Sequence, residues 1–176
     1  MLAYLFVVIA VAFRFIPHPW GFTPISASLL FFGAKGSRRM LWLPVALMMV
    51  CDIVLTKYVY GVAMTWDQWV TWAWYAGILW LGTRLKNNQK PVRVVLASLT
   101  TSVSFFVISN FAVWAATSLY PHNLAGLMMS YTIGLPHFQR SLGGDLLFTG
   151  LMFASPFALQ WLARTGNKGN DHIAAA

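Results

Sequence analysis

Charge is what this sequence lacks most. Only 9% of its 176 residues are charged, none of them is glutamate, and 59% are hydrophobic, with a mean hydropathy of +0.64. Soluble globular domains average about 25% charged residues. Each membrane-spanning helix takes about 20 apolar residues, so a chain of this length accommodates a membrane domain and leaves no room for a separate soluble one.

Catalytic signatures are also missing. The sequence contains no HExxH, GxSxG or Walker A pattern, which excludes the familiar metalloprotease, hydrolase and ATPase sites. Its single cysteine, Cys51, excludes an intramolecular disulfide, and its four histidines lack the spacing of zinc ligands. We therefore expect a protein without enzymatic activity and without a cofactor. An intramembrane enzyme that uses the aspartates and histidines is the least favoured alternative.

Six apolar segments are present instead. They cover residues 1–16, 23–34, 40–58, 69–85, 92–119 and 142–162. This pattern predicts an all-α, polytopic transmembrane bundle of about six helices over residues 1–165, followed by a disordered cytoplasmic tail over residues 166–176. As a helix, the segment 23–34 is only about 18 Å long, short of the roughly 30 Å hydrocarbon core. Whether this segment spans the membrane is therefore open.

Basic residues separate the apolar segments. They form three groups: Lys35, Arg38 and Arg39; Arg84, Lys86, Lys90 and Arg93; and Arg164 and Lys168. Because these residues interrupt apolar runs, the net charge of +8 does not indicate nucleic-acid binding. In a six-helix chain with both ends inside, all three groups lie on one side, which the positive-inside rule assigns to the cytoplasm together with the C-terminus.

Polar residues inside the apolar segments gather in the opposite, outer half of the membrane. A charge at the bilayer centre costs about 2.5 to 3.5 kcal/mol, so a charge inside a span indicates function by default. Three charged residues fall in this half, accompanied by polar residues of the fifth segment and of the connections on either side. We predict that they line a cavity open to the outside. The candidate binding residues are Arg14, His18, Asp52, Asn110, Trp114, His137, Arg140 and Asp145.

Two further interpretations concern packing and anchoring. Asp52 and Asp145 could pair with Arg14 and Arg140 only to lower the cost of burial, with no ligand involved. Four tryptophans near the outer end of the fourth segment are interpreted as bilayer anchors, with ligand stacking as the alternative: Trp66, Trp69, Trp72 and Trp74. The small residues Ser98, Thr101 and Ser102 are assigned to helix packing.

Four longer motifs carry a resemblance to a known family. They are RFIPHPWGFTP (14–24), SNFAVW (109–114), YPHNLAGL (120–127) and LPHFQRSLGGDLLFT (135–149). Over nearly its whole length the chain resembles a family of small bacterial inner-membrane proteins regarded as transport proteins, whose activity is uncharacterised. That family is similar in size and layout to the substrate-binding S components of energy-coupling factor (ECF) transporters. The resemblance implies six helices and capture of vitamins or metal ions by outward-facing loops.

The resemblance also implies a partner. S components dock onto an energising transmembrane subunit with two ATPases, often through an Ala-x-x-x-Ala pattern in the first helix. Ala3, Ala10 and Ala12 do not form this pattern, so a solitary mode stands beside docking. Some solitary S components take up cobalamin with a cysteine as cobalt ligand, which makes Cys51 a candidate thiolate ligand. The nearer family more often has serine at this position, which favours Asp52.

The leading functional hypothesis is a membrane protein that captures a small nutrient, vitamin-like or metal-linked, from outside the cell. Arg14 and Arg140 would meet its carboxylate or phosphate groups, Asn110 would orient it by hydrogen bonds, and Trp114 would stack on a ring. The alternative is a structural or assembly subunit in the bilayer that has no small-molecule ligand.

Overall fold

The computed structural model describes residues 1–17 and 21–174, the side chains of residues 166–174 aside. All regular secondary structure in this part of the chain is helical. Its helices are α1 (Leu2–Phe13), α2 (Ile25–Lys35), α3 (Trp42–Val54), α4 (Asp67–Arg84), α5 (Pro91–Ala116) and α6 (Leu124–Ala174). A 3-10 turn, Arg38–Met40, precedes α3, and a π-helical turn, Leu55–Val59, continues it. The prediction of about six helices is confirmed.

Membrane character is confirmed by length and composition. Three helical segments are long and apolar enough to cross a bilayer: Arg38–Val59, Pro91–Ala116 and Leu124–Thr165. The helices α1 and α2 are apolar but shorter. The exposed side chains of α3, α5 and α6 include many large apolar ones. This is expected where lipid rather than water surrounds a helix.

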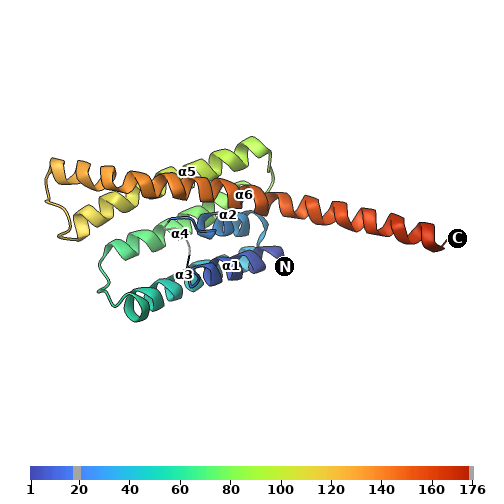
Figure 1. Ribbon diagram of the computed structural model, residues 1–176, viewed down its shortest axis with the longest axis horizontal. Coiled ribbons are helices and arrows are strands. Elements are labelled where there is room, and N and C mark those ends of the chain that lie inside the picture. Colours follow the sequence, from blue (N-terminus) through green and yellow to red (C-terminus); the bar gives the residue numbers. More distant parts are fainter. Residues whose placement is uncertain (18–20, 175–176) are drawn as a thin grey trace.

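The connections alternate between the two ends of the molecule. The N-terminus, the α2–α3 and α4–α5 connections and the C-terminus lie toward one end, and the α3–α4 and α5–α6 connections lie at the other (Figure 1). The basic connections are therefore at a common end, which we call the basic end. Which side of a membrane this end faces stays a prediction, as does the division of the chain at residue 165.

The first two helices form a short hairpin. They have 12 and 11 residues, which gives lengths of about 18 Å and about 16 Å. Both outer ends lie at the basic end, and the hairpin turns part-way along its longer neighbours (Figure 1). As a helix, the second apolar segment is thus shorter than a roughly 30 Å hydrocarbon core, and it returns from inside the bundle to the basic end (Figure 1).

The short helix α2 forms the centre of the core. Nine of its eleven residues are buried, and it packs against α1, α4, α5 and α6. Gly33 of α2 and Gly82 of α4 cross in direct backbone contact, since a Cβ added to Gly33 would lie 2.8 Å from the Gly82 Cα. Small residues let helices approach this closely in membranes. Because other helices surround α2, it does not have to match the thickness of the bilayer.

One helix begins much earlier than the sequence suggested. We expected a connection over residues 120–141 and a last helix from residue 142, whereas α6 begins at Leu124 and passes through Pro136 and Pro156. Residues 124–135 are mostly apolar, but Pro136 and the polar residues after it conceal in the sequence that the helix continues. In the structure α5 supports this part of α6, because Tyr131 donates a hydrogen bond to the carbonyl oxygen of Val107. His137 and Arg140 are therefore helical, and Asp145 lies in the middle of α6 rather than at its start.

Candidate functional site

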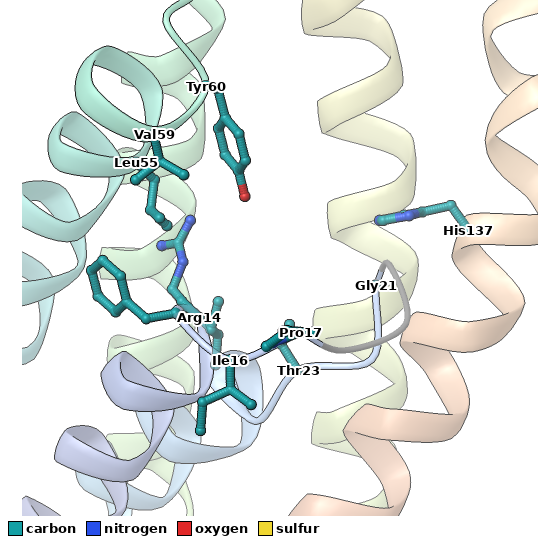
Figure 2. Close-up of a pocket in the computed structure, with 11 residues that line it drawn as sticks. Arg14, Ile16, Pro17, Gly21, Thr23, Leu55, Val59, Tyr60 and His137 are labelled. Atoms are coloured by element: carbon teal, nitrogen blue, oxygen red, sulfur yellow. The ribbon is translucent and has the colours of Figure 1, made fainter.

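Two adjoining cavities lie where the α1–α2 hairpin turns. The outer cavity measures about 630 Å³ and the inner one about 260 Å³. They share five lining residues: Arg14, Gly21, Thr23, Ile25 and His137. Figure 2 shows the outer cavity between the end of α3 on one side and His137 of α6 on the other, above the described residues of the turn. The short hairpin creates this space because its longer neighbours continue beyond it.

An ion pair forms one wall. Arg14 follows the last residue of α1, and its Nη1 atom lies 2.5 Å from Oδ1 of Asp52 on α3. This contact is an ion pair rather than a well-directed hydrogen bond. Asp52 is only 4% exposed, and a charge buried to that degree needs a partner. The pairing of Asp52 with Arg14 that the sequence suggested is thus found in the structure.

Helix α4 completes the environment of Asp52. Its Oδ2 atom accepts hydrogen bonds from Nε2 of Gln68 at 3.1 Å and from Nε1 of Trp72 at 2.9 Å, and the Tyr75 hydroxyl lies 3.5 Å from Oδ1. Charge-assisted hydrogen bonds of this kind are stronger than neutral ones. The carboxylate therefore joins α3 to α1 and α4 at the same point.

Three of these partners were missed in the sequence. Trp72 was interpreted as a bilayer anchor, yet it is 7% exposed and points to Asp52, whereas Trp66 and Trp69 are exposed. The signal available was the spacing of 68, 72 and 75, which places a polar group at each turn on one helix face. The series of tryptophans around this spacing concealed it.

The outer cavity is mainly apolar. Ile16, Leu55 and Val59 contribute aliphatic walls, and Tyr60 and His137 contribute polar tips. Figure 2 shows His137 across the opening from Arg14 and Tyr60. This cavity can take up the apolar body of a ligand and offer it a few polar contacts.

The turn depends on a glycine. Gly21 has a φ of +84°, which L side chains rarely adopt. A Cβ at this position would also lie 3.0 Å from the His137 ring. The glycine therefore lets the turn approach α6 and fixes the width of both cavities.

The inner cavity is more polar. Hydroxyl and amide groups from three helices line it: Ser26 of α2, Gln68, Thr71 and Tyr75 of α4, and Ser141 of α6. Trp74 and Phe105 close its apolar side, with their ring centroids 4.5 Å apart. Such a mixture of donors and acceptors can orient the polar end of a small molecule.

Asp145 lies outside both cavities. It is 3% exposed and accepts a hydrogen bond from the Ser102 hydroxyl at 2.6 Å, and Ser26 provides a second side-chain hydrogen bond. The suggested pairing with Arg140 is not found: Arg140 is exposed, and Asp145 makes no ion pair within the described residues. Ser102, which we assigned to packing, is thus the main polar partner of this carboxylate.

Two other predicted site residues stabilise the α5–α6 hairpin. The Asn110 side chain donates a hydrogen bond to the carbonyl oxygen of Phe106 at 2.8 Å and packs against Gly134. Trp114 donates to the carbonyl oxygen of Pro121 at 2.9 Å and packs edge-on against His122. Neither residue lines the cavities, nor does Arg140. Of the eight candidates, Arg14, Asp52 and His137 come together there, and His18 lies outside the described residues.

Cys51 is buried beside Asp52. Nowhere in the described part of the chain do three or more histidine, cysteine or acidic side chains come close enough to hold a metal ion. The geometry therefore gives the thiolate interpretation no support. A buried free cysteine behaves as a small hydrophobic residue.

Comparison with known proteins identifies the family. No curated protein and no solved structure matches the chain. A family model described as a family of unknown function, DUF6580, matches residues 1–165. The chain belongs to this family of unknown function, DUF6580.

Proposed function

We propose that this chain is a membrane protein that binds a small molecule for uptake, in the two cavities beside Arg14 and Asp52. One observation carries the proposal: an apolar cavity adjoins a polar one at a buried ion pair inside a membrane bundle. The outer cavity measures about 630 Å³ and the inner one about 260 Å³. Taken together, the two volumes lie in the range of small-molecule sites, about 300 to 1,000 Å³.

The lining favours an amphipathic ligand. Its apolar part would lie against Ile16, Leu55 and Val59, and its polar end would enter the inner cavity. Arg14 carries five N–H donors. Its Nη1 atom contacts Asp52, and Tyr75 is a further hydrogen-bonding partner of the guanidinium. The remaining N–H donors favour an oxygen-rich group such as a carboxylate. The net charge of the Arg14–Asp52 pair is close to zero, so these donors would act through hydrogen bonds more than through net charge.

The direction of uptake follows from charge. If the basic end faces the cytoplasm, as the positive-inside rule requires, the cavities open toward the outer half of the membrane. This placement suits capture from outside a bacterial inner membrane and is similar to that of ECF S components. By that similarity, an energising transmembrane subunit with ATPases would be the partner. Against such docking, α1 lacks the Ala-x-x-x-Ala pattern, which favours a protein that acts without this subunit.

A structural or assembly subunit is the second candidate. It is favoured by the completeness of the Asp52 environment, where four side chains already surround the carboxylate. In that case the ion pair only holds α1, α3 and α4 together, and the cavities contain lipid tails or water.

Ligand retention separates the two candidates. Protein purified in mild detergent would be analysed by native mass spectrometry for a co-purifying small molecule, and then by thermal unfolding against a panel of vitamins. We expect at least one compound to raise the unfolding temperature. Tyr60→Ala combined with His137→Ala should abolish that shift, since both side chains line the outer cavity and are exposed.

The matched control is Arg140→Ala combined with Tyr120→Ala, which removes a basic and an aromatic side chain away from the cavities. This variant should keep the full shift. If no compound binds, or if the control loses binding as completely as the cavity variant, the structural candidate is favoured.

A further inference from the structure

A large apolar groove opens at the basic end of the molecule. It measures about 860 Å³ and lies between α3 and α4. Leu41, Val45 and Met49 line one side, and Ala76 and Leu79 line the other. The two helices make little contact with each other here, because α4 packs chiefly on α2 and α5. The groove is unrelated to the cavities at the hairpin turn, which share none of its residues.

The groove has the length of one bilayer leaflet. Its lining runs from Arg38 to Met49, a separation of eleven residues that corresponds to about 16 Å along a helix. Half of a roughly 30 Å hydrocarbon core is about 15 Å. A single acyl chain lying along the groove would therefore extend from the headgroup region to the middle of the membrane.

Aromatic and basic side chains mark the headgroup level. Trp42 and Trp80 line the groove from opposite sides and are 62% and 59% exposed. Exposed tryptophans are typical of the membrane–water interface. Arg38 lines the same end of the groove, and the Arg84 guanidinium lies 4.5 Å from the centroid of the Trp80 ring.

The charge around this end has one sign. Lys35 and Arg39 are exposed next to Arg38, whereas the acidic residues of the segment 1–165 lie elsewhere, at Asp52, Asp67 and Asp145. Two other grooves, one between α4 and α5 and one along α5, are lined by uncharged residues alone. Among these three grooves, only the α3–α4 groove combines an apolar lining with a basic side chain.

We propose that the α3–α4 groove is a binding site for an anionic phospholipid. One acyl chain lies along the groove, and the phosphate is bound by Arg38 and Arg84. Basic pockets between helices on the cytoplasmic side recognise anionic headgroups through such contacts. The proposal does not depend on a ligand in the cavities at the hairpin turn.

The test compares two lipids with identical acyl chains. Full-length protein in detergent would be titrated with palmitoyl-oleoyl phosphatidylglycerol or phosphatidylcholine and observed by native mass spectrometry. Each basic residue near an anionic headgroup contributes about 1 kcal/mol, a factor of about five. We expect phosphatidylglycerol to bind about 5-fold to 25-fold more tightly, and Arg38→Gln with Arg84→Gln to remove that preference.

Two further variants make the result specific. Lys90→Gln with Arg93→Gln removes the same charge from the same end outside the groove and should keep the preference. Ala46→Trp fills the groove without changing charge and should weaken binding of both lipids. Equal binding of the two lipids, an equal loss in the Lys90 and Arg93 variant, or unchanged binding by Ala46→Trp would each overturn the proposal.

Discussion

The two buried carboxylates, those of Asp52 and Asp145, have different surroundings. Asp52 is 4% exposed and Asp145 is 3% exposed, so burial does not distinguish them. Asp52 faces a cation and the donors of α4, whereas Asp145 faces only hydroxyl groups. The first therefore belongs to a charged site beside a cavity, and the second to a polar contact between helices.

The contrast arises from helix lengths. Because α1 ends at Phe13, Arg14 lies inside the bundle at the same depth as Asp52 and contacts it. Asp145 lies instead on the face of α6 that packs against α5, where Ser98 and Ser102 are also buried. The Thr149 hydroxyl donates a hydrogen bond to that of Ser98 at 3.3 Å, one turn from Asp145. The same residue type thus has different roles depending on what the facing helix presents.

The largest effect is expected where one charge of the pair is removed. Asp52→Asn leaves Arg14 buried without its counter-charge, and breaking a buried pair in this way costs about 3 to 5 kcal/mol. Unfolding by a denaturing detergent would measure the loss. Arg14→Gln combined with Asp52→Asn should recover part of it, since no charge then remains unpaired. A double variant as unstable as the single one would contradict this.

A smaller loss should follow when a donor to Asp52 is removed. Trp72→Phe keeps a buried ring but deletes the indole N–H, and a hydrogen bond to a charged group contributes about 1.5 to 3 kcal/mol. The same unfolding assay applies. Trp69→Phe is the matched control, because Trp69 is exposed and its indole N–H makes no hydrogen bond to a described residue. An equal loss there would show that indole size, and not the bond to Asp52, matters.

Asp145→Asn should be milder. The asparagine keeps an oxygen for the Ser102 hydroxyl, and no cation is left unpaired, so the expected change is about 1 kcal/mol, the value of one ordinary hydrogen bond. Asp145→Leu should cost more, because it removes the acceptor that Ser102 and Ser26 share and leaves Ser102 only the carbonyl oxygen of Ser98. If Asp145→Asn destabilises the protein as much as Asp52→Asn does, the distinction between the two carboxylates is wrong.

The smallest effect is expected at Arg140. Exposed positions without specific contacts usually change stability by no more than about 0.5 kcal/mol, so Arg140→Gln should unfold like the unmodified chain. This variant sharpens the comparison, because a clear loss would reveal a partner for Arg140. Combining Arg140→Gln with Asp145→Asn should give additive changes, and strong coupling would indicate that the two side chains interact after all.

The sequence by itself determined the membrane character, the helix count and the grouping of basic residues at one end. These properties depend on apolar length and on the positions of charges along the chain, which are visible in one dimension. It also indicated the pairing of Arg14 with Asp52, because few charged residues lie inside the apolar segments and each of them needs an opposite charge. Of the seven predicted binding residues that the structure describes, however, only three came together at the cavities.

The tertiary structure decided which polar groups meet. In helices that are apolar on nearly every side, the hydrophobic pattern does not say which face is buried. Gln68, Trp72 and Tyr75 reach Asp52 across 16 to 23 residues of sequence, and Ser102 reaches Asp145 across 43. Such contacts depend on how the short α1–α2 hairpin turns inside the bundle and on how far α6 extends past its prolines. Both follow from packing between helices, which no local pattern of residues records.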